Sequence, residues 1–130
     1  MIRRTILSGA ILAWAMVAGV LSGATALRAA ELVMVERSGC PYCARWDRDV
    51  APAYERSPEG QRAPLRRVSL DDGQPRLALA APVRFTPTFL LVDGNREIGR
   101  VTGFINDAMF WGLLDKLLER LGPPPQQAGE

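Results

Sequence analysis

The stretch ERSGCPYCARW, residues 36–46, decides the fold of this chain, because a strand pattern changes to a helix pattern at a pair of cysteines. The valine-rich run that leads into it, from Glu31, predicts a buried β-strand. Cys40 then stands where the N-cap of a helix belongs, and Pro41 occupies the first helical position, where a missing N–H costs nothing. We therefore expect a strand that leads directly into a helix, with Cys40 and Cys43 at the junction.

Two cysteines separated by two residues are compatible with a structural disulfide, a metal site, a haem attachment site or a redox-active pair. A disulfide that closes so short a loop stabilises a fold by roughly 2 kcal/mol before strain is subtracted, which disfavours a purely structural bridge. The chain has no histidine, so a Ser-His-Asp triad and c-type haem attachment are excluded and zinc lacks ligands. Cu(I) binding by the two soft thiolates, in a binding module without turnover, stays open as an alternative.

The redox interpretation gives the two cysteines different roles. Sulfur at a helix N-terminus faces unpaired N–H groups and the positive end of the helix dipole, and both favour a thiolate at Cys40. Cys43, one turn into the helix, is expected to stay sheltered until it resolves the mixed disulfide on Cys40. Arg37 is a candidate to stabilise the Cys40 thiolate, and Glu36 is a candidate to accept the proton that Cys43 loses. Tyr42 is expected to be exposed and to contact the substrate.

Helix and strand patterns alternate beyond the cysteines. Trp46, Val50 and Tyr54 recur at a spacing of four and give the first helix an apolar face that belongs in the core. A proline within that helix must kink or end it. The patterns that follow predict a surface loop over 56–64, a strand and turn over 65–73, and a short helix within 74–83.

The C-terminal half predicts a β-hairpin and a last helix. Thr88–Val92 and Glu97–Thr102 are rich in strand-forming residues, and the sequence DGN between them is a turn signal. Asn106 is placed to cap a helix that Gly122 ends. The predicted apolar stripe of this helix is Phe110, Leu113, Leu114, Leu117, Leu118 and Leu121. The order of elements predicts an α/β fold with a mixed, four-stranded sheet and helices on both faces.

The first 29 residues have the composition of an export signal. Two arginines precede an uncharged run, Thr5–Leu27, and small residues at its end permit cleavage. An uncleaved N-terminal anchor is the alternative, and both versions export the domain. We expect a globular domain over 30–122 and a disordered tail over 123–130. The net charge is only +2 and the basic residues are dispersed, so we expect no nucleic-acid partner.

The motif CPYC at a strand-to-helix junction, followed by FTPTF before a hairpin, resembles the thioredoxin superfamily over nearly all of 31–121, and CPYC itself is similar to glutaredoxins. The resemblance implies a thioredoxin-like fold, thiol-disulfide oxidoreductase activity, and no cofactor or metal other than the redox-active disulfide Cys40–Cys43. It also implies a cis peptide bond before Pro87, which packs beside the cysteines. The backbone of Thr86 then offers a short edge to an extended substrate segment.

Two departures from the family pattern bear on the partner. Gly39 stands where thioredoxins proper carry tryptophan. In GFINDA, Gly103 and Asp107 partly match the glutathione-binding stretch of glutaredoxins, but Asn106 and Asp107 are equally explained as a helix cap with a first-turn acid. Glutathione therefore stays open as a partner.

Within the superfamily, the chain is similar to the periplasmic thioredoxins encoded with bacterial sulfur-oxidation systems. That similarity implies a periplasmic location and a protein substrate with a reactive cysteine or disulfide, such as a sulfur-carrier protein whose cysteine is kept in its working redox state. A membrane thiol-reductant would then recharge the pair. Reduction of protein or mixed disulfides is the expected direction, and a periplasmic disulfide oxidase is the alternative.

Overall fold

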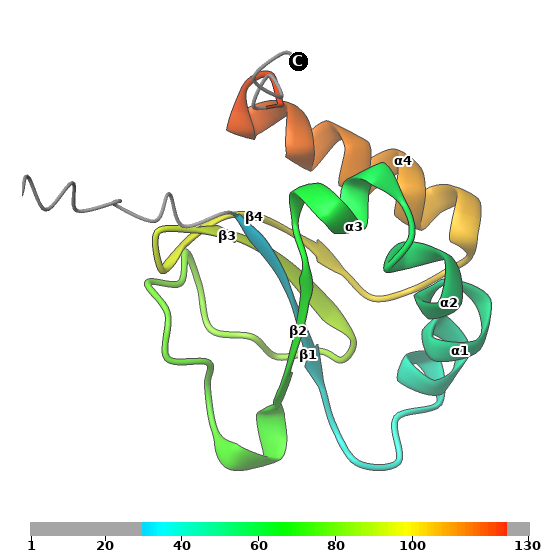
Figure 1. Cartoon of the computed structure of the whole chain (residues 1–130). Coiled ribbons are helices and arrows are strands. Elements are labelled where there is room, and N and C mark those ends of the chain that lie inside the picture. The colour runs from blue at the N-terminus through cyan, green and yellow to red at the C-terminus, as the bar shows by residue number, and fades with distance from the viewer. Residues whose placement is uncertain (1–29, 125–130) are drawn as a thin grey trace, which may run out of the picture.

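The computed structural model describes residues 30–124, so the predicted signal segment and most of the predicted tail lie outside the described residues. The described part forms one mixed sheet with helices packed against it (Figure 1). None of the helices in this part is long and apolar enough to cross a bilayer.

The sheet has four strands in the order β2-β1-β3-β4. β1 (Glu31–Glu36) pairs in parallel with β2 (Leu65–Ser69) and antiparallel with β3 (Thr88–Asp93). β3 pairs antiparallel with β4 (Arg96–Thr102), across the predicted hairpin. The central strands β1 and β3 are almost continuously apolar because both of their faces are covered. The predicted mixed, four-stranded sheet flanked by helices is confirmed.

The helices begin and end where prolines and caps allow. α1 (Pro41–Asp49) stops before Pro52, which lies in the first turn of the next helix, as the sequence predicted. The predicted surface loop over 56–64 is wrong in part, since Ser57 accepts a hydrogen bond from the Gly60 N–H at 2.9 Å and caps a short helix. The other helical elements are α2 (Ala51–Tyr54), α3 (Pro58–Arg62), η1 (Leu70–Asp72), α4 (Asp107–Leu118) and η2 (Glu119–Leu121).

An aromatic core lies between the helices and one face of the sheet. Trp46 is fully buried, as predicted, with ring centroids 5.1 Å from Phe89 on β3 and 5.6 Å from Phe110 on α4. Most of the predicted stripe of α4 packs here, and Leu121 is partly buried against it. Leu113 is the exception, because its side chain is 41% exposed.

The other face of the sheet is covered by the connection between β2 and β3 rather than by a helix (Figure 1). The helix predicted within 74–83 and the expected α-helical cover on both faces of the sheet are therefore wrong, since the connection holds only the short 3-10 helix η1. Gln74 donates to the Val83 carbonyl at 2.8 Å and accepts from the Val83 N–H at 2.7 Å, which closes an extended loop. Ala78 forms a parallel bridge with Arg96 at the β4 edge, so its backbone groups are paired across the sheet instead of along a helix.

Glu97 and Arg100 on β4 fasten this connection. The Glu97 side chain is only 2% exposed and accepts from Arg100 Nε at 2.5 Å, from Arg100 Nη2 at 2.7 Å and from the Ala80 N–H at 2.8 Å. Arg100 also donates to the Ala81 carbonyl at 2.6 Å. The hydrogen bonds from Arg100 hold the pKa of Glu97 below its usual value.

We predict that Glu97→Gln destabilises the fold by about 2 kcal/mol at pH 7, because charge-assisted hydrogen bonds to a buried group are lost. A carboxylate with a lowered folded pKa stabilises the fold above its unfolded pKa, near 4.5, and loses that contribution as the pH falls through the folded value. The difference between variant and wild type should therefore shrink at low pH, as measured by urea unfolding. Exposed Glu55→Gln is the control. Equal stabilities of Glu97→Gln and wild type at pH 7 would contradict a stabilising role of the Glu97–Arg100 ion pair.

Candidate active site

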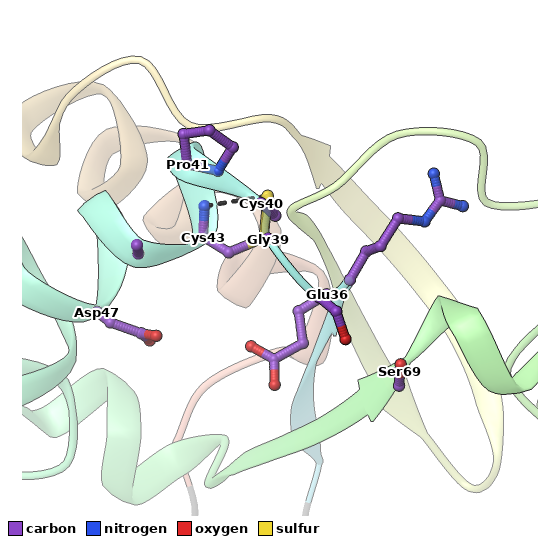
Figure 2. A pocket seen from close by; sticks show the side chains of 10 residues that line it. Glu36, Gly39, Cys40, Pro41, Cys43, Asp47 and Ser69 are labelled. Carbon is purple, nitrogen blue, oxygen red and sulfur yellow. Dashed lines mark hydrogen bonds between the residues drawn. A yellow bond between two sulfur atoms is a disulfide. The ribbon is translucent and has the colours of Figure 1, made fainter.

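Cys40 and Cys43 form a disulfide at the N-terminus of α1, with Cα atoms 5.3 Å apart (Figure 2). Cys40 is the N-cap, and its Sγ accepts a hydrogen bond from the Cys43 N–H at 3.2 Å. Cys40 is partly exposed, whereas Cys43 is only 4% exposed and belongs to the aromatic core. The two sulfurs therefore differ in access and in hydrogen bonding, and a partner reaches Cys40 first.

The loop between β1 and α1 is held by Asp71. Asp71 accepts from the Ser38 N–H at 2.9 Å and forms an ion pair with Arg37 at 3.3 Å. The hydrogen bond from Ser38, with the Arg37 charge, lowers the pKa of Asp71. Gly39 follows at a φ of +72°, a conformation that favours glycine over the tryptophan of thioredoxins proper. The Arg37 charge is thus shared with a carboxylate, and its proposed effect on Cys40 stays a prediction.

Glu36, Arg37, Cys40 and Cys43 are brought together along one groove of 620 Å³. Figure 2 shows Glu36 and Asp47 turning their carboxylates toward each other from β1 and α1, on the side of Cys43. The groove is lined by Glu36, Arg37, Ser38, Gly39, Cys40, Pro41, Cys43, Ala44, Asp47 and Ser69. It gives the sheltered cysteine a carboxylate-lined opening to solvent.

Arg67 on β2 holds the two carboxylates in place. Its guanidinium bonds Asp47 at 2.7 Å and Glu36 at 3.0 Å, and lies 5.8 Å from the ring centroid of Trp46. Burial opposes the charge, but the hydrogen bonds and charges of Asp47 and Glu36 outweigh it and raise the pKa of Arg67. Arg67 therefore stays a cation that ties the end of β1 to α1.

Sequence reasoning missed Asp47 and Arg67. Asp47 follows Cys43 by four residues, so helical spacing places both on one face of α1. Strand alternation likewise places Arg67 and Ser69 on the same face of β2. These periodicities give the face on which each side chain lies, but not that the two faces meet.

The predicted substrate-binding residues lie outside the lining of this groove. Tyr42 is 55% exposed, as predicted. The Thr86–Pro87 peptide bond is cis, also as predicted. Pro87 is buried and its carbonyl accepts from the Gly103 N–H at 2.7 Å, while partly exposed Thr86 makes no backbone hydrogen bond to any residue within 30–124. Substrate contacts by Tyr42, Thr86 and Pro87 stay predictions.

Two open alternatives can be placed in the structure. Asn106 caps α4, since its Oδ1 accepts from the Met109 N–H at 2.9 Å, which supports the helix-cap explanation of this stretch. Asp107 is exposed in the first turn, and glutathione binding there stays untested. Over residues 30–124, no group of three or more metal-ligating side chains is found, and Cu(I) binding by the two cysteines alone is likewise untested.

A helix-capping cysteine, in a disulfide with a buried partner one turn later, on a four-stranded mixed sheet, defines a thiol-disulfide oxidoreductase. The chain belongs to the thioredoxin-like domain family, whose model matches residues 23–118. A comparison with curated proteins finds no match.

The solved structures that are similar to this chain include two thioredoxins. The periplasmic thioredoxin SoxS from Paracoccus pantotrophus, in its reduced form, is 44% identical with a TM-score of 0.68, over 71% of this chain and 98% of that one. A thioredoxin from Thermus thermophilus is 23% identical with a TM-score of 0.52, over 72% of this chain and 76% of that one. The second supports the fold alone.

Proposed function

We propose that this protein is exported to the periplasm and reduces a disulfide on a protein partner, through attack by Cys40 and resolution by Cys43. The observation that carries the proposal is the asymmetry of the pair. Cys40 is partly exposed and its sulfur accepts a helix N-terminal N–H, whereas Cys43 is buried. Unpaired N–H groups and the helix dipole stabilise a thiolate at the capping position, which is the nucleophile in disulfide exchange.

The reaction transfers two electrons in two exchanges. In the dithiol form, the Cys40 thiolate attacks one sulfur of the partner's disulfide, forms a mixed disulfide and releases the partner's other sulfur as a thiolate. Cys43 then loses its proton and attacks the Cys40 sulfur, which forms the Cys40–Cys43 disulfide and releases the partner's second thiolate. A thiol reductant, which we assign to a membrane donor, must restore the dithiol.

The location and the partner are supported by similarity. The pair of arginines and the following uncharged run within 1–29 favour a signal peptide. The 44% identity to a periplasmic thioredoxin supports the same compartment. Together with the resemblance to thioredoxins of sulfur-oxidation systems, it favours as the partner a sulfur-carrier protein whose reactive cysteine is kept in its working redox state.

Glu36 is our proposed proton acceptor for Cys43. Both residues line the groove, and the carboxylate is held there by Arg67 at 3.0 Å. Asp47, on the same guanidinium, is placed to share the role. A positioned carboxylate accelerates proton transfer in the resolving step and leaves the first attack, by a sulfur that is already a thiolate, unchanged.

We predict that Cys40→Ser abolishes the protein's catalysis of insulin reduction by dithiothreitol, because the remaining cysteine, Cys43, is only 4% exposed. Cys43→Ser should instead accumulate the mixed disulfide on Cys40. Mass spectrometry of the complex trapped in a periplasmic extract then identifies the partner.

Each alternative predicts a different result, either in these experiments or in a measurement of Cu(I) binding or of substrate oxidation. Full activity of Cys40→Ser contradicts the assignment. Capture of glutathione alone contradicts the sulfur-carrier partner. Tight binding of one Cu(I) ion per chain without any disulfide exchange favours the binding module, and net oxidation of reduced substrates in a glutathione buffer favours an oxidase.

We further predict that Glu36→Gln slows resolution of the mixed disulfide tenfold or more, within the usual range for a lost general base, and that the first attack keeps its rate. Stopped-flow absorbance with a chromogenic mixed disulfide separates the two steps. Glu36→Gln should change the pH profile of the resolution rate and leave the pH profile of the first attack unchanged. Glu31→Gln is a matched control, because Glu31 lies on the same strand and is also paired with a β2 arginine, Arg66, at 2.8 Å. Equal resolution rates in the two variants would rule out the proposed role.

A further inference from the structure

Three apolar side chains between β4 and the first turns of α4 are exposed without a role in the core. Ile105, Met109 and Leu113 are 63%, 47% and 41% exposed. We call these three residues the α4 patch. Single exposed apolar residues are common on protein surfaces, but a contiguous group around a hollow marks an interaction site.

The α4 patch surrounds a pocket. The three side chains, with Phe104 and Phe110 behind them, line a cavity of 120 Å³. An apolar cavity of about 150 Å³ binds one benzene molecule. The pocket in this chain is smaller than that, so it is suited to one aliphatic side chain of leucine size rather than to an aromatic ring.

The rim of the pocket is hydrogen-bonded to the two segments on which the proposed disulfide exchange depends. The Ile105 carbonyl accepts from Arg45 Nη2 at 2.7 Å, and Arg45 follows Cys43 by two residues on α1. The Gly103 N–H donates to the Pro87 carbonyl at 2.7 Å. The segment that forms the rim of the pocket is thus bonded both to the helix of the disulfide and to the cis-proline segment.

We propose that the α4 patch binds an apolar side chain of the protein whose disulfide is exchanged at Cys40. This inference rests on the proposed function and specifies its substrate class: a protein segment with a leucine-sized aliphatic residue near the reactive cysteine. Within residues 30–124 the backbone of Thr86 makes no hydrogen bond, and the next residue, Pro87, accepts one from Gly103, so an extended segment that pairs with Thr86 would lie next to the rim of the pocket. A small disulfide carries no such side chain and gains nothing from the patch.

The test uses peptides whose single cysteine is disulfide-bonded to thionitrobenzoate. One leucine is placed in turn at each position up to about six residues on either side, roughly 20 Å of extended chain, and the other residues are serine and glycine. The rate of capture on Cys40 is measured in a Cys43→Ser background, so the result is independent of turnover. Hydroxyethyl disulfide serves as the small-molecule reference.

We expect at least one leucine position to raise the capture rate about tenfold over the leucine-free peptide, the factor that partial burial of a leucine side chain provides. Met109→Gln with Leu113→Gln should remove that gain without changing the rate with hydroxyethyl disulfide. Glutamine keeps the helix propensity of both positions. Lys116→Gln, an exposed change on the same helix outside the pocket lining, should keep the gain. Ile105→Thr, outside the helix, is a second variant that should reduce it.

Absence of a rate gain at every leucine position, or a gain that survives the double substitution, would overturn the docking site. Failure of the reductase function has a different signature. Leucine-dependent capture in the Cys43→Ser background without insulin reduction by the wild-type chain would contradict reduction and support the docking site.

Discussion

The hydrogen bond from the Cys43 N–H to the Cys40 sulfur is the interaction on which the site depends. It forms because Pro41 starts the helix directly after the β1 loop, so that a sulfur takes the place of the usual side-chain oxygen at the N-cap. The same helix start places Trp46 one turn beyond Cys43, in the centre of the aromatic core. One strand-to-helix junction thus orients one sulfur toward solvent, buries the other and anchors the fold.

The two roles that we propose, proton transfer and partner recognition, belong to different elements. The carboxylates lie at the end of β1 and on α1, where Arg67 from β2 ties them together. The apolar pocket lies on β4, α4 and the segment between them. Arg45 joins the two regions, because it follows the cysteines on α1 and bonds the Ile105 carbonyl at 2.7 Å. If the α4 patch binds the partner as we propose, changes in partner preference can arise on α4 while the chemistry at the cysteines is kept.

Elements that depend on local patterns were predictable from the sequence. The strand from Glu31, the cap at Cys40 and the hairpin before Arg96 are each fixed by residues close together in the chain. The segment 74–83 was mispredicted because its backbone partners are distant, on β4 and in the Gln74–Val83 closure. Leu113 matched the helical period but falls at the edge of the buried face, which only the packing of α4 decides. The ion pair between Asp47 and Arg67 was not predictable either, because it joins α1 to β2.

The most direct test of the asymmetric pair is the site of the mixed disulfide in the wild-type chain. Reduced protein is mixed with a disulfide-containing protein substrate, and acid is added before the reaction is complete to stop the exchange. Peptide mass spectrometry then identifies the cysteine to which the substrate is attached. The account predicts that the substrate is attached to Cys40, the partly exposed N-cap sulfur. Attachment to Cys43, or equal attachment to both cysteines, would contradict it.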